Sequence, residues 1–116
     1  MLFRSRPLYL AVAERVRTWN ENRNVGLVVG ATYPGELARV RAACPELPIL
    51  LPGVGAQQGN LEAAVAAGID RDRMGLVVVA ARQVLYASSG PDFPQAARQA
   101  AATLRDRINL ARRTTP

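Results

Sequence analysis

Residues 49–59 read Ile-Leu-Leu-Pro-Gly-Val-Gly-Ala-Gln-Gln-Gly, an aliphatic run that passes directly into a glycine-rich segment. Aliphatic runs without polar alternation are typical of parallel strands that are buried on both faces. Two further runs of this kind lie on either side, at residues 25–29 and 76–79. The sequence therefore predicts three parallel strands, of which the middle one ends at the glycine-rich segment.

Helical patterns alternate with these strands. Apolar residues recur at helical spacing over residues 8–19, and a second helix is expected from Pro34, a residue that suits the first helical turn. Asn60 is expected to cap a third helix that ends at a C-cap glycine, Gly68. A longer helix follows in the C-terminal part of the chain. The order α-β-α-β-α-β-α is the rhythm of successive βα units.

Right-handed crossovers between consecutive parallel strands place all the connecting helices on one face of the sheet. The opposite face of the two-sided strands is then left bare. A complete (β/α)8 barrel takes about 250 residues, so a chain of 116 residues is predicted to form a single partial domain over 1–116 that is less than half of such a barrel. The rest of the barrel or a second subunit would cover the bare face.

Composition excludes several classes of protein. With 49% apolar and 21% charged residues, the chain falls in the globular range. No apolar run approaches the roughly 20 residues of a membrane span, and we expect no signal peptide. The single cysteine, Cys44, cannot form an internal disulfide, so we expect a cytoplasmic protein. Because the chain has no histidine, no zinc site is expected.

All 15 basic residues are arginines, and the formal net charge is +6. They are spread along the chain and aromatic residues make up only 5%, so we expect no nucleic-acid surface. Most are instead expected on solvated helix faces. These are Arg15, Arg17, Arg39, Arg41, Arg71, Arg73, Arg98 and Arg105.

The glycine-rich segment is a candidate phosphate site. Gly53, Gly55 and Gly59 would let backbone N–H groups approach an anion, next to the N-terminus of the helix that Asn60 caps. The spacing is G-x-G-x-x-x-G, which is not the dinucleotide fingerprint, and no Gly-Lys-Ser/Thr follows as in a P-loop. A glycine-rich turn that binds no ligand is the alternative.

Arg82 is the second candidate, because it follows the last aliphatic run. An arginine at the carboxyl end of a barrel strand can bind a phosphate through two parallel hydrogen bonds. Together with the glycine-rich segment of the preceding unit, it would form the two-loop phosphate site that such barrels often carry. A plain surface arginine is the alternative.

These segments resemble the orotidine 5′-phosphate decarboxylase family, most closely its longer bacterial form. The resemblance is carried by Val-Gly-Ala-Thr-Tyr-Pro at 29–34, Pro-Gly-Val-Gly-Ala-Gln at 52–57, Ala-Arg at 81–82 and Leu-Tyr-Ala at 85–87, and it extends over residues 7–109. It implies that the chain forms the last three βα units of a (β/α)8 TIM barrel. It also implies decarboxylation of orotidine monophosphate to uridine monophosphate, with no metal or organic cofactor, usually by a homodimer.

The resemblance assigns residues to the phosphate end of the substrate. Gln57 would hydrogen-bond the phosphate through its side-chain amide, and Arg82 would pair with it. The backbone N–H groups of Ala81 and Arg82 would complete the cradle, and Gly53 and Gly55 would shape the loop.

Two positions depart from the family. Gln58 stands where the family usually has glycine, and Ala81 where it often has glycine or serine. Either change keeps a backbone donor, so it bears on loop flexibility more than on binding.

The family's catalytic centre is absent from this sequence. In the family that this chain resembles, the centre is an alternating Asp/Lys array with an Asp-x-Lys-x-x-Asp motif. This chain has no lysine. We therefore expect no catalytic residue here and an inactive isolated chain. Its partners would be orotidine or uridine monophosphate and either a second copy or a complementing N-terminal barrel half.

Two alternatives remain open at this point. The first is a non-catalytic half-barrel that binds phosphorylated ligands and self-associates. The second is another phosphate-binding (β/α)8 enzyme with the same terminal loops.

Overall fold

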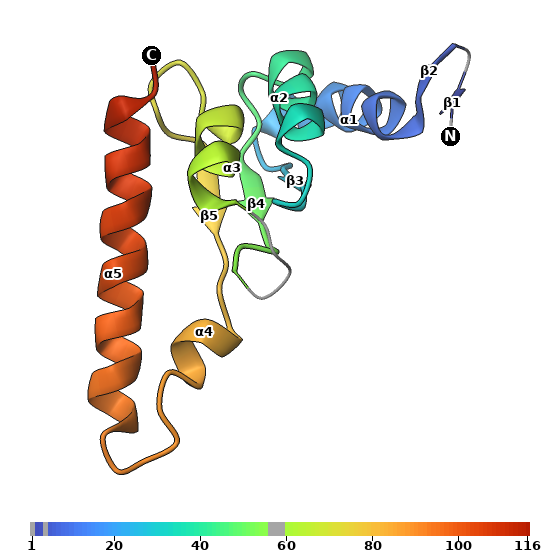
Figure 1. The fold of residues 1–116 in the computed structure, drawn as a ribbon. Helices are drawn as coiled ribbons and strands as arrows, with labels where there is room; N and C mark the ends of the chain where they lie inside the picture. Colours follow the sequence, from blue (N-terminus) through green and yellow to red (C-terminus); the bar gives the residue numbers. More distant parts are fainter. Residues whose placement is uncertain (1, 4, 56–59) are drawn as a thin grey trace.

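The structure of the protein, a computed structural model, describes residues 2–3, 5–55 and 60–116. Three strands, β3 (Leu27–Val28), β4 (Ile49–Leu51) and β5 (Leu76–Val78), form a parallel sheet in the order β3-β4-β5 (Figure 1). The three predicted strands and their sequential order are confirmed.

The four predicted helices are present. They are α1 (Leu8–Thr18), α2 (Pro34–Ala43), α3 (Leu61–Gly68) and α5 (Phe93–Thr114). As expected, the Asn60 side chain caps α3 by accepting a 2.9 Å hydrogen bond from the N–H of Ala63. Gly68 is not the C-cap glycine that was predicted. It is the last helical residue of α3, and an added Cβ there would stand 2.8 Å from the Leu76 side chain, so glycine is needed for close packing.

Four short elements were not predicted from the sequence. β1 (Leu2–Phe3) and β2 (Arg6–Pro7) form a small antiparallel hairpin before α1. A 3-10 turn, η1 (Asn20–Asn22), follows α1, and a four-residue helix, α4 (Arg82–Leu85), follows β5. Elements of two to four residues show no periodicity in the sequence, because they are too short for a hydrophobic pattern to repeat.

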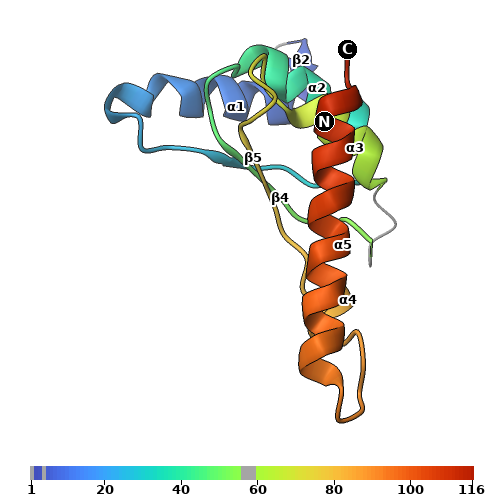
Figure 2. The ribbon, with the colours of Figure 1, turned by 90° about the vertical axis from the view of Figure 1, so that its left-hand side faces the viewer.

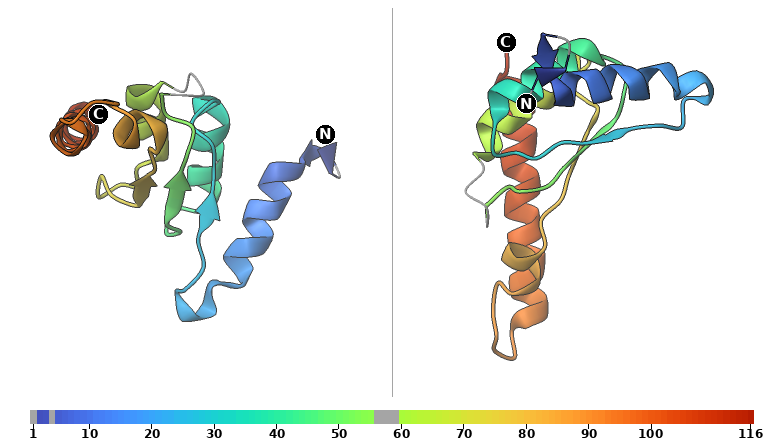
Figure 3. Two further views of the ribbon diagram at one scale, coloured as in Figure 1. Left: turned by 90° about the horizontal axis from the view of Figure 1, so that it is seen from below. Right: turned by 90° about the vertical axis from the view of Figure 1, so that its right-hand side faces the viewer.

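The helices cover one face of the sheet. Viewed from below, α2 and α3 lie on the same side of the three strands (Figure 3). Along β4, Ile49 and Leu51 point into this layer and are fully buried, together with Leu37 of α2 and Val65 of α3. The predicted one-sided arrangement, which is that of a partial (β/α)8 barrel, is confirmed.

The opposite face of the sheet carries an exposed aliphatic row. Val28, Leu50 and Val77 are register partners on the three strands, and they are 69%, 39% and 57% exposed. Side chains of alternate strand residues point to opposite faces, so this row lies opposite the buried layer. The bare face expected from right-handed crossovers is therefore present.

The molecule is elongated. Its radius of gyration is 15.8 Å and its extents are 54 × 29 × 27 Å, whereas a compact domain of this length has a radius of about 13 Å. Helix α4 and the N-terminal half of α5 project together beyond the sheet (Figures 1 and 2). Within the described residues, no helix has both the length and the apolar character needed to cross a membrane.

Arg41 of α2 is buried, contrary to the prediction that it lies on a solvated helix face. Its side chain is only 7% exposed, whereas the other arginines of that predicted group are exposed. Burial lowers the pKa of the Arg41 guanidinium, and the nearby Asp70 carboxylate opposes this effect. An arginine side chain stays cationic through such shifts, so the fold holds a buried charge.

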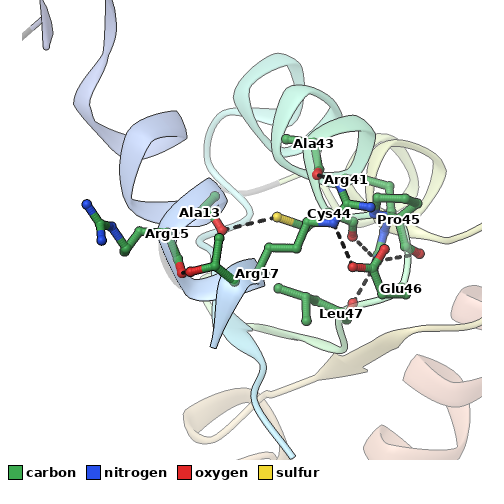
Figure 4. A network of polar contacts seen from close by, with 10 residues as sticks. Ala13, Arg15, Arg17, Arg41, Ala43, Cys44, Pro45, Glu46 and Leu47 are labelled. Atoms are coloured by element: carbon green, nitrogen blue, oxygen red, sulfur yellow. Dashed lines mark hydrogen bonds and ion pairs between the residues drawn. The ribbon is translucent and has the colours of Figure 1, made fainter. Parts of the chain in front are cut away.

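The Arg41 guanidinium donates hydrogen bonds to backbone carbonyls of separate segments. The shortest bonds run to Gly68 at the end of α3 (2.6 Å), to Leu47 before β4 (2.7 Å) and to Gly75 before β5 (3.0 Å). Longer bonds reach Cys44 and Pro45 at the end of α2 (Figure 4). Among the described residues, no buried side-chain polar atom lacks a partner.

The neighbouring contacts attach α1 to the same region. The Cys44 thiol donates to the Ala13 carbonyl of α1 at 3.3 Å, and Arg17 pairs with Glu46 at 2.7 Å (Figure 4). Burial raises the pKa of the Cys44 thiol, which keeps it protonated. The hydrogen bond from Arg17 lowers the pKa of the Glu46 carboxyl.

We expect the substitution Arg41→Met to destabilise the chain by at least about 3 kcal/mol, because several buried carbonyls would lose their donor. Arg41→Lys should recover only part of this loss, since one ammonium group cannot span the three segments. Urea unfolding monitored by circular dichroism measures both changes. Arg39→Met on the same helix is the control, because Arg39 is exposed and its hydrogen bond among the described residues goes to the Tyr9 hydroxyl. Equal losses for Arg39→Met and Arg41→Met would contradict the assignment.

Candidate functional site

The carboxyl ends of the three strands meet at one edge of the sheet. Hydrogen bonds continue the strand pairing beyond the strands themselves, from Val29 N–H to the Leu50 carbonyl (3.0 Å) and from Ala31 N–H to the Pro52 carbonyl (2.9 Å). On the other side, Val79 N–H donates to the Leu51 carbonyl (3.1 Å). The loops that follow the three strands therefore begin side by side.

The loop after β4 depends on glycine at two described positions. Gly53 has φ +92° and Gly55 has φ +79°, a left-handed conformation that side-chain-bearing residues rarely adopt. Between them, Val54 is buried and fixes the loop to the core. The two predicted loop-shaping glycines thus sit where the backbone requires them.

Arg82 begins helix α4. Strand β5 ends at Val78, so Arg82 lies beyond the strand end on which the sequence placed it, and its side chain is exposed. Ala81, also exposed, precedes it as the N-cap residue. Within the described part of the chain, no carbonyl accepts from the N–H groups of Ala81 and Arg82, as expected for the first donors of a helix.

The structure brings the glycine loop and α4 into contact. A Cβ added to Gly55 would collide with the side-chain carboxamide of Gln83, the residue after Arg82. Glycine is therefore required at position 55 for two reasons: the left-handed backbone conformation and the closeness of the Gln83 side chain. Sequence reasoning missed Gln83, because nothing in the run of residues after β5 shows which side chain faces the neighbouring loop.

Gln57, the other predicted phosphate ligand, belongs to residues 56–59 and lies outside the described residues. Its assignment stays a prediction, as do the assignments of Arg82, Ala81, Gly53 and Gly55 to phosphate binding. Over the described ranges 2–3, 5–55 and 60–116, no group of His, Cys, Asp or Glu residues is arranged to hold a metal ion.

Comparison with known proteins identifies what the chain is related to. It is 59% identical over 109 residues to the orotidine 5′-phosphate decarboxylase of Roseiflexus castenholzii, and 54% identical over 108 residues to that of Thermomicrobium roseum. These matches cover 93% and 92% of the chain. The chain belongs to the orotidine 5′-phosphate decarboxylase family. It spans about 40% of the length of these relatives, which fits the prediction that it corresponds to the C-terminal portion.

A solved structure agrees with this placement in the orotidine 5′-phosphate decarboxylase family. The OMP decarboxylase of Leishmania donovani superimposes with a TM-score of 0.81 at 44% sequence identity, over 97% of this chain and 41% of that one. The predicted fold, a part of a (β/α)8 barrel, is confirmed by this match. No protein-family profile matches the chain.

The contact between Gly55 and Gln83 predicts a non-additive double substitution. Gly55→Ala should cost about 1–3 kcal/mol, because it adds left-handed backbone strain to a collision with Gln83. Combining it with Gln83→Ala should remove the collision and leave the strain, so the double variant should be more stable than the sum of the single losses by about 0.5 kcal/mol or more.

Urea unfolding of the single and double variants measures this coupling. Gly35→Ala on α2 is the control, because an added Cβ at Gly35 meets no atom within 4 Å, and alanine favours a helix over glycine. Strictly additive losses for Gly55→Ala and Gln83→Ala would show that the two residues do not interact.

Proposed function

We propose that this chain provides the phosphate-binding part of an orotidine 5′-phosphate decarboxylase, which converts orotidine monophosphate to uridine monophosphate and CO2 in de novo pyrimidine biosynthesis. The observation that carries the proposal is the contact between the glycine loop after β4 and the helix that begins with Arg82. Similarity to enzymes named for this reaction supports the choice of substrate.

The proposed site binds the phosphate from two sides. The loop containing Gly53 and Gly55 approaches closely because these residues carry no side chain, and Gln57 would add its amide. From the other side, the Arg82 guanidinium would form charge-assisted hydrogen bonds, which are shorter and stronger than neutral ones. The backbone N–H groups of Ala81 and Arg82 would donate hydrogen bonds to the remaining phosphate oxygens. No metal or organic cofactor enters the proposal.

The chemistry itself would be carried out elsewhere. Decarboxylation breaks the bond between the carboxylate carbon and the pyrimidine ring and leaves an electron pair on the ring carbon, which must then take up one proton. In the family that this chain resembles, a lysine supplies that proton, and this chain has no lysine. We therefore propose that a complementing N-terminal barrel half provides the lysine, and that the two parts meet in the cytoplasm. The phosphate contacts of this chain would contribute binding energy that is used at the reacting end of the substrate.

Binding of uridine monophosphate tests the phosphate assignment. We expect Arg82→Ala to weaken binding about 10-fold or more, because a charge-assisted hydrogen bond contributes about 1.5–3 kcal/mol. Binding of uridine, which lacks the phosphate, should be unchanged. Two-dimensional NMR titration of the 116-residue chain measures both affinities, with Arg98→Ala on α5 as the control arginine.

The same samples should not convert orotidine monophosphate above the buffer rate. If Arg82→Ala and Arg98→Ala bind uridine monophosphate equally well, Arg82 is not a phosphate ligand. Turnover by the chain alone would show that it holds a catalytic group of its own.

One observation favours a second candidate, a non-catalytic half-barrel that binds phosphorylated ligands and self-associates. The aliphatic row Val28, Leu50 and Val77 is exposed in the single chain, and contiguous exposed apolar surface commonly marks an interface. On this candidate, sedimentation should show an oligomer that Val77→Asp dissociates, because a charge in an apolar contact is costly. A folded monomer at all concentrations would count against it.

A further inference from the structure

Gln83 makes a specific contact that the resemblance to known enzymes does not assign. Its carboxamide occupies the space that a side chain at Gly55 would fill, with Cδ 3.1 Å and Nε2 3.7 Å from the Cβ position. The carboxamide therefore lies directly against the backbone of the loop after β4.

Helix α4 is attached to the rest of the chain mainly through its packing against α5. It has only four residues, and it projects beyond the sheet together with the N-terminal half of α5, against which it packs (Figures 1 and 2). Its residues Arg82, Gln83 and Leu85 are exposed. Short exposed elements with few buried contacts lie at the low-stability end of a fold. The contact of Gln83 with Gly55 ties the first turn of α4 back to the edge of the sheet.

The position of this contact matters because of the neighbouring residue. Arg82 directly precedes Gln83 in the chain, so the contact that fixes Gln83 also limits where the backbone of Arg82 can move relative to the loop. A charge-assisted pair needs donors held in place, since small displacements of positioning groups reduce binding and rate steeply.

We propose that Gln83 is a positioning residue, whose side chain packs on Gly55 and sets the spacing between the glycine loop and Arg82 at the phosphate end of the substrate. This inference rests on the proposed function. It assigns Gln83 no direct contact with the ligand. Binding of the phosphate, which would touch both the loop and Arg82, depends on this spacing. Binding of the uracil and the ribose does not.

The test compares uridine monophosphate with uridine as ligands of the full 116-residue chain. In Gln83→Ala, the affinity for uridine monophosphate should fall about threefold to tenfold, because the loop and Arg82 are no longer held at one spacing. The affinity for uridine should stay within twofold. Gln83→Met should recover most of the loss, because methionine has a similar length and adapts to irregular spaces. Gln95→Ala on α5 is the control glutamine substitution.

Each outcome decides the matter. A selective loss in Gln83→Ala that Gln83→Met restores supports the positioning role. An equal loss for both ligands assigns Gln83 a purely structural role, and unchanged affinities show that the spacing does not depend on it; either result overturns the inference while the proposed function stands. If the unsubstituted chain binds uridine monophosphate no better than uridine, the proposed function fails, and the positioning role fails with it.

Discussion

The buried guanidinium of Arg41 is the interaction on which the packing of the three βα units depends. One cation joins the end of α2, the end of α3 and the starts of β4 and β5 through backbone carbonyls. Carbonyls at helix ends and in connecting loops must find donors when they are buried. The Arg41 side chain supplies such donors at the amino ends of the strands.

The candidate site lies at the opposite end of the same strands. There the chain uses glycine backbone and a short helix, α4, which leaves the loops accessible to a ligand. The molecule thus separates one end, where the buried Arg41 holds backbone carbonyls of several segments, from an open end with exposed residues such as Arg82. Barrel enzymes commonly divide stability and function between the two ends of their strands in this way.

Much of this arrangement could be predicted from the sequence. The three aliphatic runs, the helix periodicity and the cap at Asn60 determine the order of elements, because each depends on local pattern. Arg41 could not be predicted, since a helical arginine looks the same in sequence whether it faces solvent or carbonyls of distant segments. The contact of Gln83 could not be predicted for the same reason. Its partner Gly55 is 28 positions away in the chain (83 − 55), and only the folded loop brings the two residues together.

The two-sided character of the strands has a consequence for register. In β4, Ile49 and Leu51 face the helices and Leu50 faces the other side, yet all three are aliphatic. A slip by one residue, which would turn every side chain to the opposite face, would still place an aliphatic residue in the core. Hydrophobic patterning alone therefore cannot distinguish the native alignment from a slipped one. Because Arg41 binds the carbonyls of Leu47 and Gly75, just ahead of β4 and β5, it fixes where each strand begins, and so selects one alignment among several of similar hydrophobicity.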